Sequence, residues 1–190
     1  MKLFKSLLVL TAASFLCGMP LPAQQQKKAA STGGNSPHET TSAVIDGNRV
    51  TVTYGRPFSK DPKSGEMRKI WGGLVPWGKA WRTGSDEATV LITEMPLQFG
   101  ETTIPAGAHT LYTVPSESGA TMLVFSKHLG KWGIPVDEKN DLARVEMKKD
   151  ALDTQVDQFT LSVEKNAGGG GILKLKWENT QFSAAFTVKK

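Results

Sequence analysis

The stretch TSAVIDGNRVTVTY, residues 41–54, decides the fold class of this chain. Its two halves, residues 41–45 and 49–54, are separated by Asp46-Gly47-Asn48, in which Asp-Gly readily adopts the positive φ angles of a tight hairpin turn. In the second half Val50, Val52 and Tyr54 recur at every other position, which places them on one face of a strand. The stretch therefore predicts an antiparallel β-hairpin with one buried face.

The rest of the chain repeats this pattern of short apolar or alternating runs between Gly, Pro, Asn and Asp. Further strands are predicted at residues 88–93, 97–99, 102–104, 110–114, 121–126, 142–147, 159–163, 172–177 and 182–188. No window of about a dozen residues carries a helical stripe, and a parallel sheet would need crossover helices. The sequence predicts an all-β domain of about ten short strands, arranged as an antiparallel β-sandwich or a jelly-roll-like fold.

The N-terminus has the composition of a secretory signal peptide. Lys2 and Lys5 precede an apolar run, residues 7–18, and a short turn-forming segment ends at Ala23. The apolar run is shorter than the roughly 20 residues that span a bilayer as a helix. We therefore expect cleavage near Ala23, no stable membrane span in the mature chain, and an exported protein that is periplasmic or extracellular.

The sequence divides into three segments. Residues 1–23 form the predicted signal peptide. Residues 24–36, QQQKKAASTGGNS, have no large apolar side chain that could offset the entropy lost on ordering, and they are predicted to be a flexible tether. Residues 37–190 are predicted to form a single β-rich domain.

Charge and cysteine content exclude several classes of function. Loss of the first 23 residues leaves a net charge near +3, and no dense basic patch with interleaved aromatic residues is present, so nucleic acid is not an expected partner. The sole cysteine, Cys17, lies in the predicted signal peptide, which excludes disulfides and thiolate chemistry from the mature chain. The three histidines have no ligand spacing such as HxH or HExxH, and we expect neither a metal site nor a cofactor.

Residues 54–87 do not have the composition of a scaffold. They hold three tryptophans, several glycines and many charges without strand or helix periodicity. Loops of this length are uncommon in compact domains and are often functional. The tryptophans offer flat faces on which sugar rings or peptides stack, and the alternative is a small core beneath the loop.

Several motifs resemble a known family. They are SPHET at 36–40, VTYGRP at 52–57, RKIWGGLVPWGKAWRTGSDEAT at 68–89, IPAGAHTLYTVP at 104–115 and KWG at 131–133. This set resembles the domain-of-unknown-function family 2911, found in exported bacterial proteins. The resemblance implies a β-rich fold and export, and no established catalytic mechanism.

Candidate ligand-binding residues gather in and around this loop. They are Tyr54, Arg56, Trp77, Arg82, Thr83 and Glu87. A fixed Arg82 can clamp a carboxylate or phosphate through two parallel hydrogen bonds, with Glu87 orienting it, and Arg56 can form a second positive wall. The alternative is a structural pair between arginine and carboxylate that ties the loop to the sheet.

Three hypotheses for function follow from these residues. The first is a domain that binds a small polar or anionic ligand, such as a sugar, a sugar acid or an envelope fragment, in a pocket formed by residues 54–87. The second is an envelope hydrolase in which Glu87 or Asp86 is the acid or base, His38 is its partner and Arg82 stabilises developing negative charge. The third is a structural or assembly module that contacts another envelope component.

Overall fold

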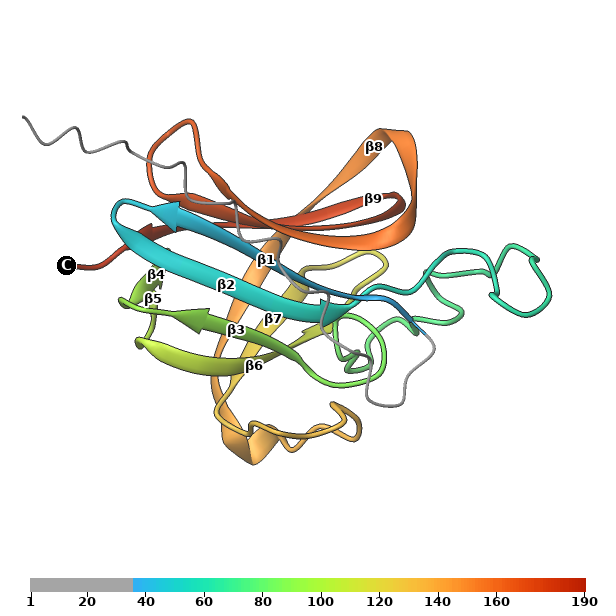
Figure 1. Ribbon diagram of the computed structural model, residues 1–190, viewed down its shortest axis with the longest axis horizontal. Coiled ribbons are helices and arrows are strands. Elements are labelled where there is room, and N and C mark those ends of the chain that lie inside the picture. Colours follow the sequence, from blue (N-terminus) through green and yellow to red (C-terminus); the bar gives the residue numbers. More distant parts are fainter. Residues whose placement is uncertain (1–35) are drawn as a thin grey trace, which may run out of the picture.

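A computed structural model of the chain describes residues 36–190, so the predicted signal peptide and nearly all of the predicted tether lie outside the described residues. Nine antiparallel strands form one sheet in the order β1-β2-β3-β6-β7-β8-β9-β4-β5 (Figure 1). The strands are β1 (His38–Ile45), β2 (Asn48–Gly55), β3 (Thr89–Thr93), β4 (Leu97–Phe99), β5 (Thr102–Ile104), β6 (Gly107–Val114), β7 (Thr121–Ser126), β8 (Asp141–Lys165) and β9 (Gly171–Val188). A single 3₁₀ turn, η1 (Glu138–Asn140), precedes β8.

Two long strands turn this sheet into a sandwich. The first part of β8 pairs with β7, and the remainder pairs with β9, whose end pairs with β4. In Figure 1 the part of β8 that pairs with β9 lies over β1 and β2, and β8 contacts both of these strands. The Tyr54 hydroxyl of β2 joins the two layers, because it donates to the Leu161 carbonyl of β8 (3.1 Å) and accepts from the Leu161 N–H (2.9 Å). The domain is all-β, antiparallel and sandwich-like, as predicted.

The predicted hairpin is present, and Asn48 belongs to its second strand, not to the turn. Strands β1 and β2 pair along their whole length and are joined by Asp46 and Gly47, both of which have positive φ (49° and 86°). Val50, Val52 and Tyr54 are all buried on one face. The two-residue period of the sequence thus predicted the core face of this strand correctly.

The strand count differs from the prediction in one respect. The predicted strands at residues 142–147 and 159–163 belong to a single strand, β8, and those at 172–177 and 182–188 belong to β9. The residues between them lose the apolar alternation, and pairing between β8 and β9 continues on either side of two register shifts. Backbone pairing through a bulge needs no apolar side chain, so this continuity leaves no signal in the sequence.

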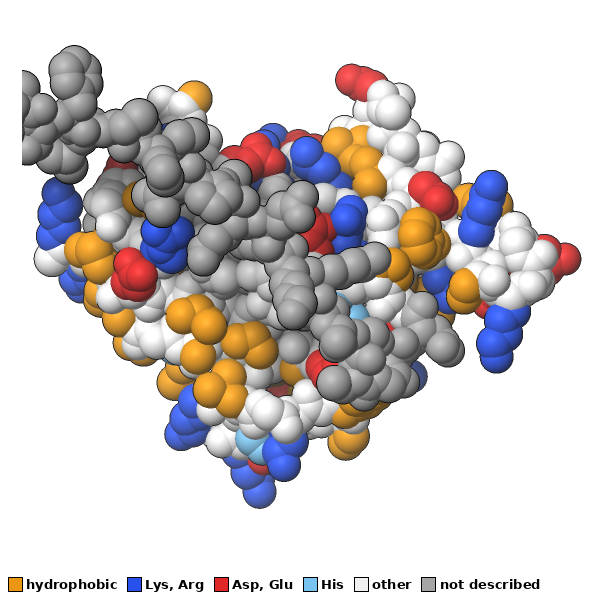
Figure 2. Space-filling model, viewed as in Figure 1, with side chains coloured by type: hydrophobic (Ala, Val, Ile, Leu, Met, Phe, Trp, Pro, Cys, Tyr) orange, Lys and Arg blue, Asp and Glu red, His pale blue; other side chains and the backbone are white. Residues whose placement is uncertain are grey.

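The long loop between β2 and β3, residues 56–88, projects from one end of the sandwich (Figure 1). In the space-filling view basic and acidic side chains lie close together over this projection (Figure 2). Its two ends are fixed to the sheet. Phe159 donates its N–H to the Pro57 carbonyl (2.9 Å), and Trp81 and Thr113 exchange two backbone hydrogen bonds of 2.8 Å.

The loop also contributes to the core. Ile70 and Val75 are at most 1% exposed, and Trp81 is 8% exposed. Trp81 stacks on Trp177 of β9 with ring centroids 6.0 Å apart and meets Phe159 of β8 edge to face at 5.0 Å. The alternative expected for the tryptophans, a small core beneath the loop, is therefore present.

Candidate functional site

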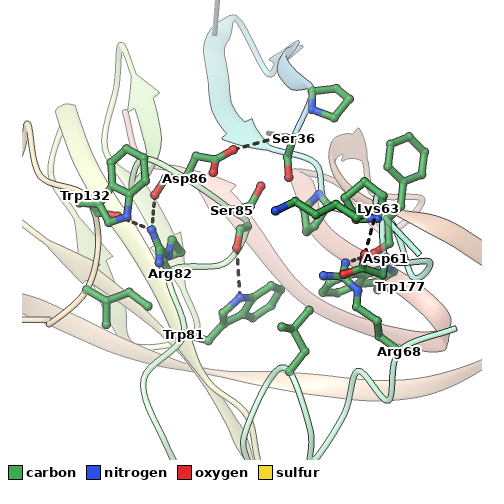
Figure 3. Close-up of a pocket in the computed structure, with 17 residues that line it drawn as sticks. Ser36, Asp61, Lys63, Arg68, Trp81, Arg82, Ser85, Asp86, Trp132 and Trp177 are labelled. Carbon is green, nitrogen blue, oxygen red and sulfur yellow. Dashed lines mark hydrogen bonds between the residues drawn. The ribbon is translucent and has the colours of Figure 1, made fainter. Parts of the chain in front are cut away.

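A cavity of about 600 Å³ lies where the loop meets the start of β1. Its walls come from residues 36–37, from the projecting loop, from the turn at residues 81–86 and from the segment at residues 132–134. Figure 3 shows Arg82 and Trp132 on one side of the cavity, and Lys63, Asp61 and Arg68 on the other. Segments far apart in the sequence thus form one site.

Three tryptophans contribute to the apolar part of the walls. Trp81 and Trp177 form the stacked pair described above, and both line the cavity. Trp132 lines it from the opposite loop and is 48% exposed. The cavity therefore offers both fixed and accessible aromatic surface, a common feature of sites that bind flat or ring-shaped ligands.

Three cations line the same cavity: Lys63, Arg68 and Arg82. Within residues 36–190 none of them has a carboxylate oxygen within the 4.0 Å of a salt bridge. Arg68 donates instead to the backbone carbonyls of Phe58 and Ser59. The guanidinium groups of Arg68 and Arg82 are therefore held by neutral acceptors, and none of the three charges is cancelled by a directly bonded acid within residues 36–190.

Two acids share the cavity wall, and each is tied to backbone N–H groups. Asp61 accepts from the N–H groups of Ser64 (3.1 Å) and Lys63 (2.9 Å), and these bonds hold its pKa below the usual value. Asp86 accepts from the N–H of Ser36 (3.2 Å). With three cations and two acids, the wall has a net charge of +1.

Arg82 is the predicted ligand-binding residue that the structure places on the cavity wall. Its Nη1 donates to the carbonyl of Asp86 and to that of Trp132 (3.0 Å), and its guanidinium lies 5.6 Å from the centre of the Trp132 ring. Burial lowers the pKa of Arg82, and the Asp86 carboxylate opposes that shift. Arg82 thus joins the turn to the loop that carries Trp132.

The turn that carries Arg82 is held in a strained conformation. Thr83 (φ 58°) and Asp86 (φ 64°) both have positive φ, which is unfavourable for residues with a Cβ and unusual for a β-branched one. Thr89 Oγ1 donates to the Thr83 carbonyl (2.8 Å), and Trp81 Nε1 donates to the Gly84 carbonyl (3.1 Å). These buried hydrogen bonds keep the turn in place.

Close contact with β2 also holds this turn in place. A Cβ on Gly55 would lie 2.1 Å from the Ser85 carbonyl oxygen and 2.7 Å from its Oγ. Only glycine allows this approach, so the glycine of the VTYGRP motif seats Ser85 against the strand.

Two further predicted residues meet beside the cavity. His38 Nε2 of β1 lies 2.8 Å from Glu87 Oε2, and the two side chains are 12% and 37% exposed. This is the pairing expected in the hydrolase hypothesis. Asp86, the other acid named there, lines the cavity itself.

The remaining predicted ligand-binding residues do not line the cavity, and they carry structural contacts. Tyr54 is buried against Leu161, and burial raises its pKa to about 12. Arg56 pairs with Glu39 at 2.5 Å and donates to the Phe159 carbonyl (3.1 Å), contacts that anchor the start of the loop. Thr83 is fully buried. Trp77 stacks on Trp71 with centroids 5.9 Å apart.

Sequence reasoning missed most residues of the wall, among them Asp61, Lys63, Arg68, Trp132 and Trp177. Lys63 and Arg68 are two of many charges in the loop, and nothing in their spacing distinguishes them. Trp177 alternates as an ordinary strand residue. Trp132 belongs to the KWG motif at residues 131–133 and Arg68 begins the motif at residues 68–89, and these motifs were the available signal.

Two further observations concern the described part of the chain as a whole. Between residues 36 and 190 no three His, Cys, Asp or Glu side chains come together as a group that could hold a metal ion. The same residues include no helix of the length and apolar character needed to cross a membrane.

Comparison with known proteins places the chain in a family. A search of curated proteins and a search of solved structures returned no match. The model of the family described as "Protein of unknown function (DUF2911)" matches residues 36–186, which include every strand from β1 to most of β9 and every segment of the cavity wall. The chain therefore belongs to the DUF2911 family of proteins of unknown function.

Proposed function

We propose that this protein is exported and binds a small anionic ligand, such as a sugar acid or an acidic envelope fragment, in the cavity between the projecting loop and residues 132–134. The observation that carries the proposal is the set of three cations, Lys63, Arg68 and Arg82, around one tryptophan-lined cavity with no carboxylate bonded to them within residues 36–190.

The charges favour an anion. A guanidinium fixed by backbone carbonyls keeps its charge and its remaining N–H groups for a ligand, and a carboxylate or phosphate matches their geometry. Arg82 uses Nη1 for its two carbonyl partners, and in the described chain no acceptor is assigned to its Nε or Nη2. Arg82 therefore has donors left with which to bind an oxyanion.

The shape and the aromatic walls favour a ring of modest size. A volume of about 600 Å³ lies within the range of roughly 300–1,000 Å³ that is typical of small-molecule sites. Trp132, which is 48% exposed, presents apolar surface on which the face of a sugar ring packs. A sugar acid combines this ring with the negative charge that the cations select.

A thermal-shift screen of the purified protein tests the proposal. The panel contains neutral sugars, sugar acids, phosphate esters and peptidoglycan fragments. A ligand at 100 times its dissociation constant adds about 2.7 kcal/mol to the free energy of unfolding, or roughly 5–10 °C in Tm for a domain of this size. We expect acidic members of the panel to raise Tm and their neutral counterparts to raise it less.

Two variants show whether the shift comes from this cavity. Arg82→Ala should abolish the shift. Arg49→Ala removes a cation on β2 whose side chain is 58% exposed and 3.9 Å from Glu94, and it should keep the shift. An equal shift in all three proteins, or none with any acidic ligand, would contradict the proposal.

A further inference from the structure

Two buried polar atoms beside the cavity have no hydrogen-bond partner in the described chain: Ser85 Oγ and His38 Nδ1. Leaving such a group unpaired costs about 1–3 kcal/mol, so each one in a folded protein needs an explanation. Ser85 lines the cavity, and His38 is bonded through its other nitrogen to Glu87. The two unpaired atoms therefore belong to residues at or beside the same cavity.

Strand register brings the hydroxyl and the imidazole together. His38 and Gly55 are partners in the β1–β2 ladder, and because Arg56 donates its N–H to Pro37 (2.7 Å), this pair is the close, non-hydrogen-bonded type. Side chains of such a pair share a face, with Cβ atoms about 4.5–5.5 Å apart. Since a Cβ on Gly55 would lie 2.7 Å from Ser85 Oγ, the hydroxyl occupies the space next to the His38 side chain.

The hydroxyl and the imidazole are not hydrogen-bonded to each other in this structure, because both atoms are unpaired. Hydrogen bonds between a nucleophile and its base are often long in the absence of substrate and shorten when it binds. Catalysis requires the Ser85 hydroxyl and His38 Nδ1 to move closer together. Such a movement breaks no hydrogen bond of the hydroxyl, because the hydroxyl makes none.

A carboxylate contacts the other nitrogen of the His38 imidazole. Glu87 Oε2 lies 2.8 Å from His38 Nε2, so it holds the ring in one orientation and stabilises the proton that the ring gains. The strained turn between Thr83 and Asp86 carries Ser85 and lies one residue before Glu87. Backbone strain of this kind persists where a surrounding structure enforces it, and it is concentrated at functional sites.

We propose that Ser85, His38 and Glu87 form a nucleophile, base and positioning carboxylate that hydrolyse an ester of the anionic molecule held in the cavity. The inference rests on the proposed binding function for its substrate class. It goes beyond that function by assigning a covalent reaction to Ser85.

The steps are those of acyl transfer. Ser85 Oγ forms a bond to the acyl carbon while His38 Nδ1 takes its proton, and Arg82, on the same wall, stabilises the oxyanion. The carbon–oxygen bond to the alcohol breaks, and the alcohol leaves with the proton from His38. Water then attacks the acyl-serine, again with His38 as base, and the carboxylic acid leaves as the Ser85 hydroxyl is restored.

A fluorophosphonate probe tests the nucleophile directly. The purified protein is incubated with the probe, and the modified residue is identified by peptide mass spectrometry. We expect one adduct, on Ser85. Ser85→Ala should abolish the adduct and lower hydrolysis of p-nitrophenyl acetate to the background rate, whereas Ser116→Ala, a change in an outer turn, should leave both unchanged.

Further variants separate the roles of the other two residues. His38→Gln should slow labelling by roughly 10²- to 10⁴-fold, the usual range for loss of a general base. Glu87→Gln should lower kcat with little change in KM, and Glu87→Asp should restore part of it. Ser85→Ala should unfold at the same temperature as the parent or above it, because the hydroxyl that it removes makes no hydrogen bond, so loss of labelling there is not loss of fold.

Failure of this proposal is distinguishable from failure of the binding proposal. If Ser85 is not labelled while the Arg82-dependent thermal shift persists, the catalytic assignment is wrong and the binding function stands. If Ser85 is labelled at the same rate in His38→Gln, His38 is not the base. If Ser85 is labelled and no acidic ligand changes Tm, the substrate class proposed for the cavity is wrong.

Discussion

At the scale of single residues, burial decides which polar groups are structural. The chain has only two tyrosines, Tyr54 and Tyr112, and both are at most 2% exposed with their hydroxyls hydrogen-bonded. Burial raises the pKa of Tyr54 to about 12. Burial, together with a hydrogen bond to Asp141, also raises the pKa of Tyr112 above its usual value. Neither phenol is therefore available as a proton donor to a ligand near neutral pH.

The raised pKa values predict a loss of stability in strong base. In the unfolded chain both phenols ionise near pH 10, whereas the folded protein keeps them neutral. The stabilisation from Tyr54 is complete below pH 10 and is lost as pH rises from 10 through 12, a change of about 2–3 kcal/mol. In urea, an absorbance titration should show tyrosinate forming near pH 10. Without urea, tyrosinate should form only near pH 12 or when the protein unfolds.

The Tyr54→Phe variant is the control for this titration. It leaves Tyr112 as the only phenol, so the remaining signal belongs to that residue. A tyrosine that ionises close to pH 10 in the folded parent protein would show that one of the two rings is accessible to water, against the burial described here.

At the scale of elements, the long loop forms both the wall of the cavity and part of the core. Residues 56–88 begin and end on sheet hydrogen bonds, at Pro57 and Trp81. Between them Ile70 is 1% exposed, whereas Leu74, four residues further on, is 48% exposed and faces the cavity. The folded loop thus has a buried side and a solvent-exposed side, although the apolar residues in its sequence follow no regular period.

This division predicts unequal effects of two similar truncations. Ile70→Ala should lower the free energy of unfolding by about 2–5 kcal/mol, because it removes a buried side chain and leaves a cavity. Leu74→Ala should change it by no more than about 0.5 kcal/mol, because that side chain is largely in solvent. Urea denaturation of both variants measures the difference, and equal, small effects would mean that the loop does not belong to the core.

At the scale of the whole molecule, β8 and β9 make the two layers of the sandwich interdependent. Each strand pairs with neighbours in more than one part of the sheet. The aromatic cluster of Trp71, Trp81 and Trp177 lies where the loop meets β9. Separation of the layers would therefore expose this cluster and break strand pairing at the same time.

We expect a single cooperative unfolding transition as a result. Tryptophan fluorescence reports chiefly on the aromatic cluster and far-UV circular dichroism on the strands, and their urea midpoints should coincide. A fluorescence transition at lower urea than the dichroism transition would show that the loop and its cluster unfold independently of the sheet.

The sequence by itself determined the fold class and the position of nearly every strand. Burial of one face of a strand requires apolar residues at every second position, which is a local pattern that can be read from the sequence. The Asp-Gly pair at residues 46–47 likewise specifies its turn through local backbone conformation. The motifs also indicated the family, and they included Arg82, Asp86 and Glu87, which lie at or beside the cavity.

Only the tertiary structure decided which side chains form the site. Proximity in sequence grouped Tyr54, Arg56, Trp77 and Thr83 with Arg82, but these four carry structural contacts instead. The cavity is completed by Arg68, Trp132 and Trp177, which come from separate parts of the chain. Their meeting depends on strand order, on the bends of β8 and β9 and on the path of one aperiodic loop. All of these arise from long-range packing, which leaves no periodic trace in the sequence.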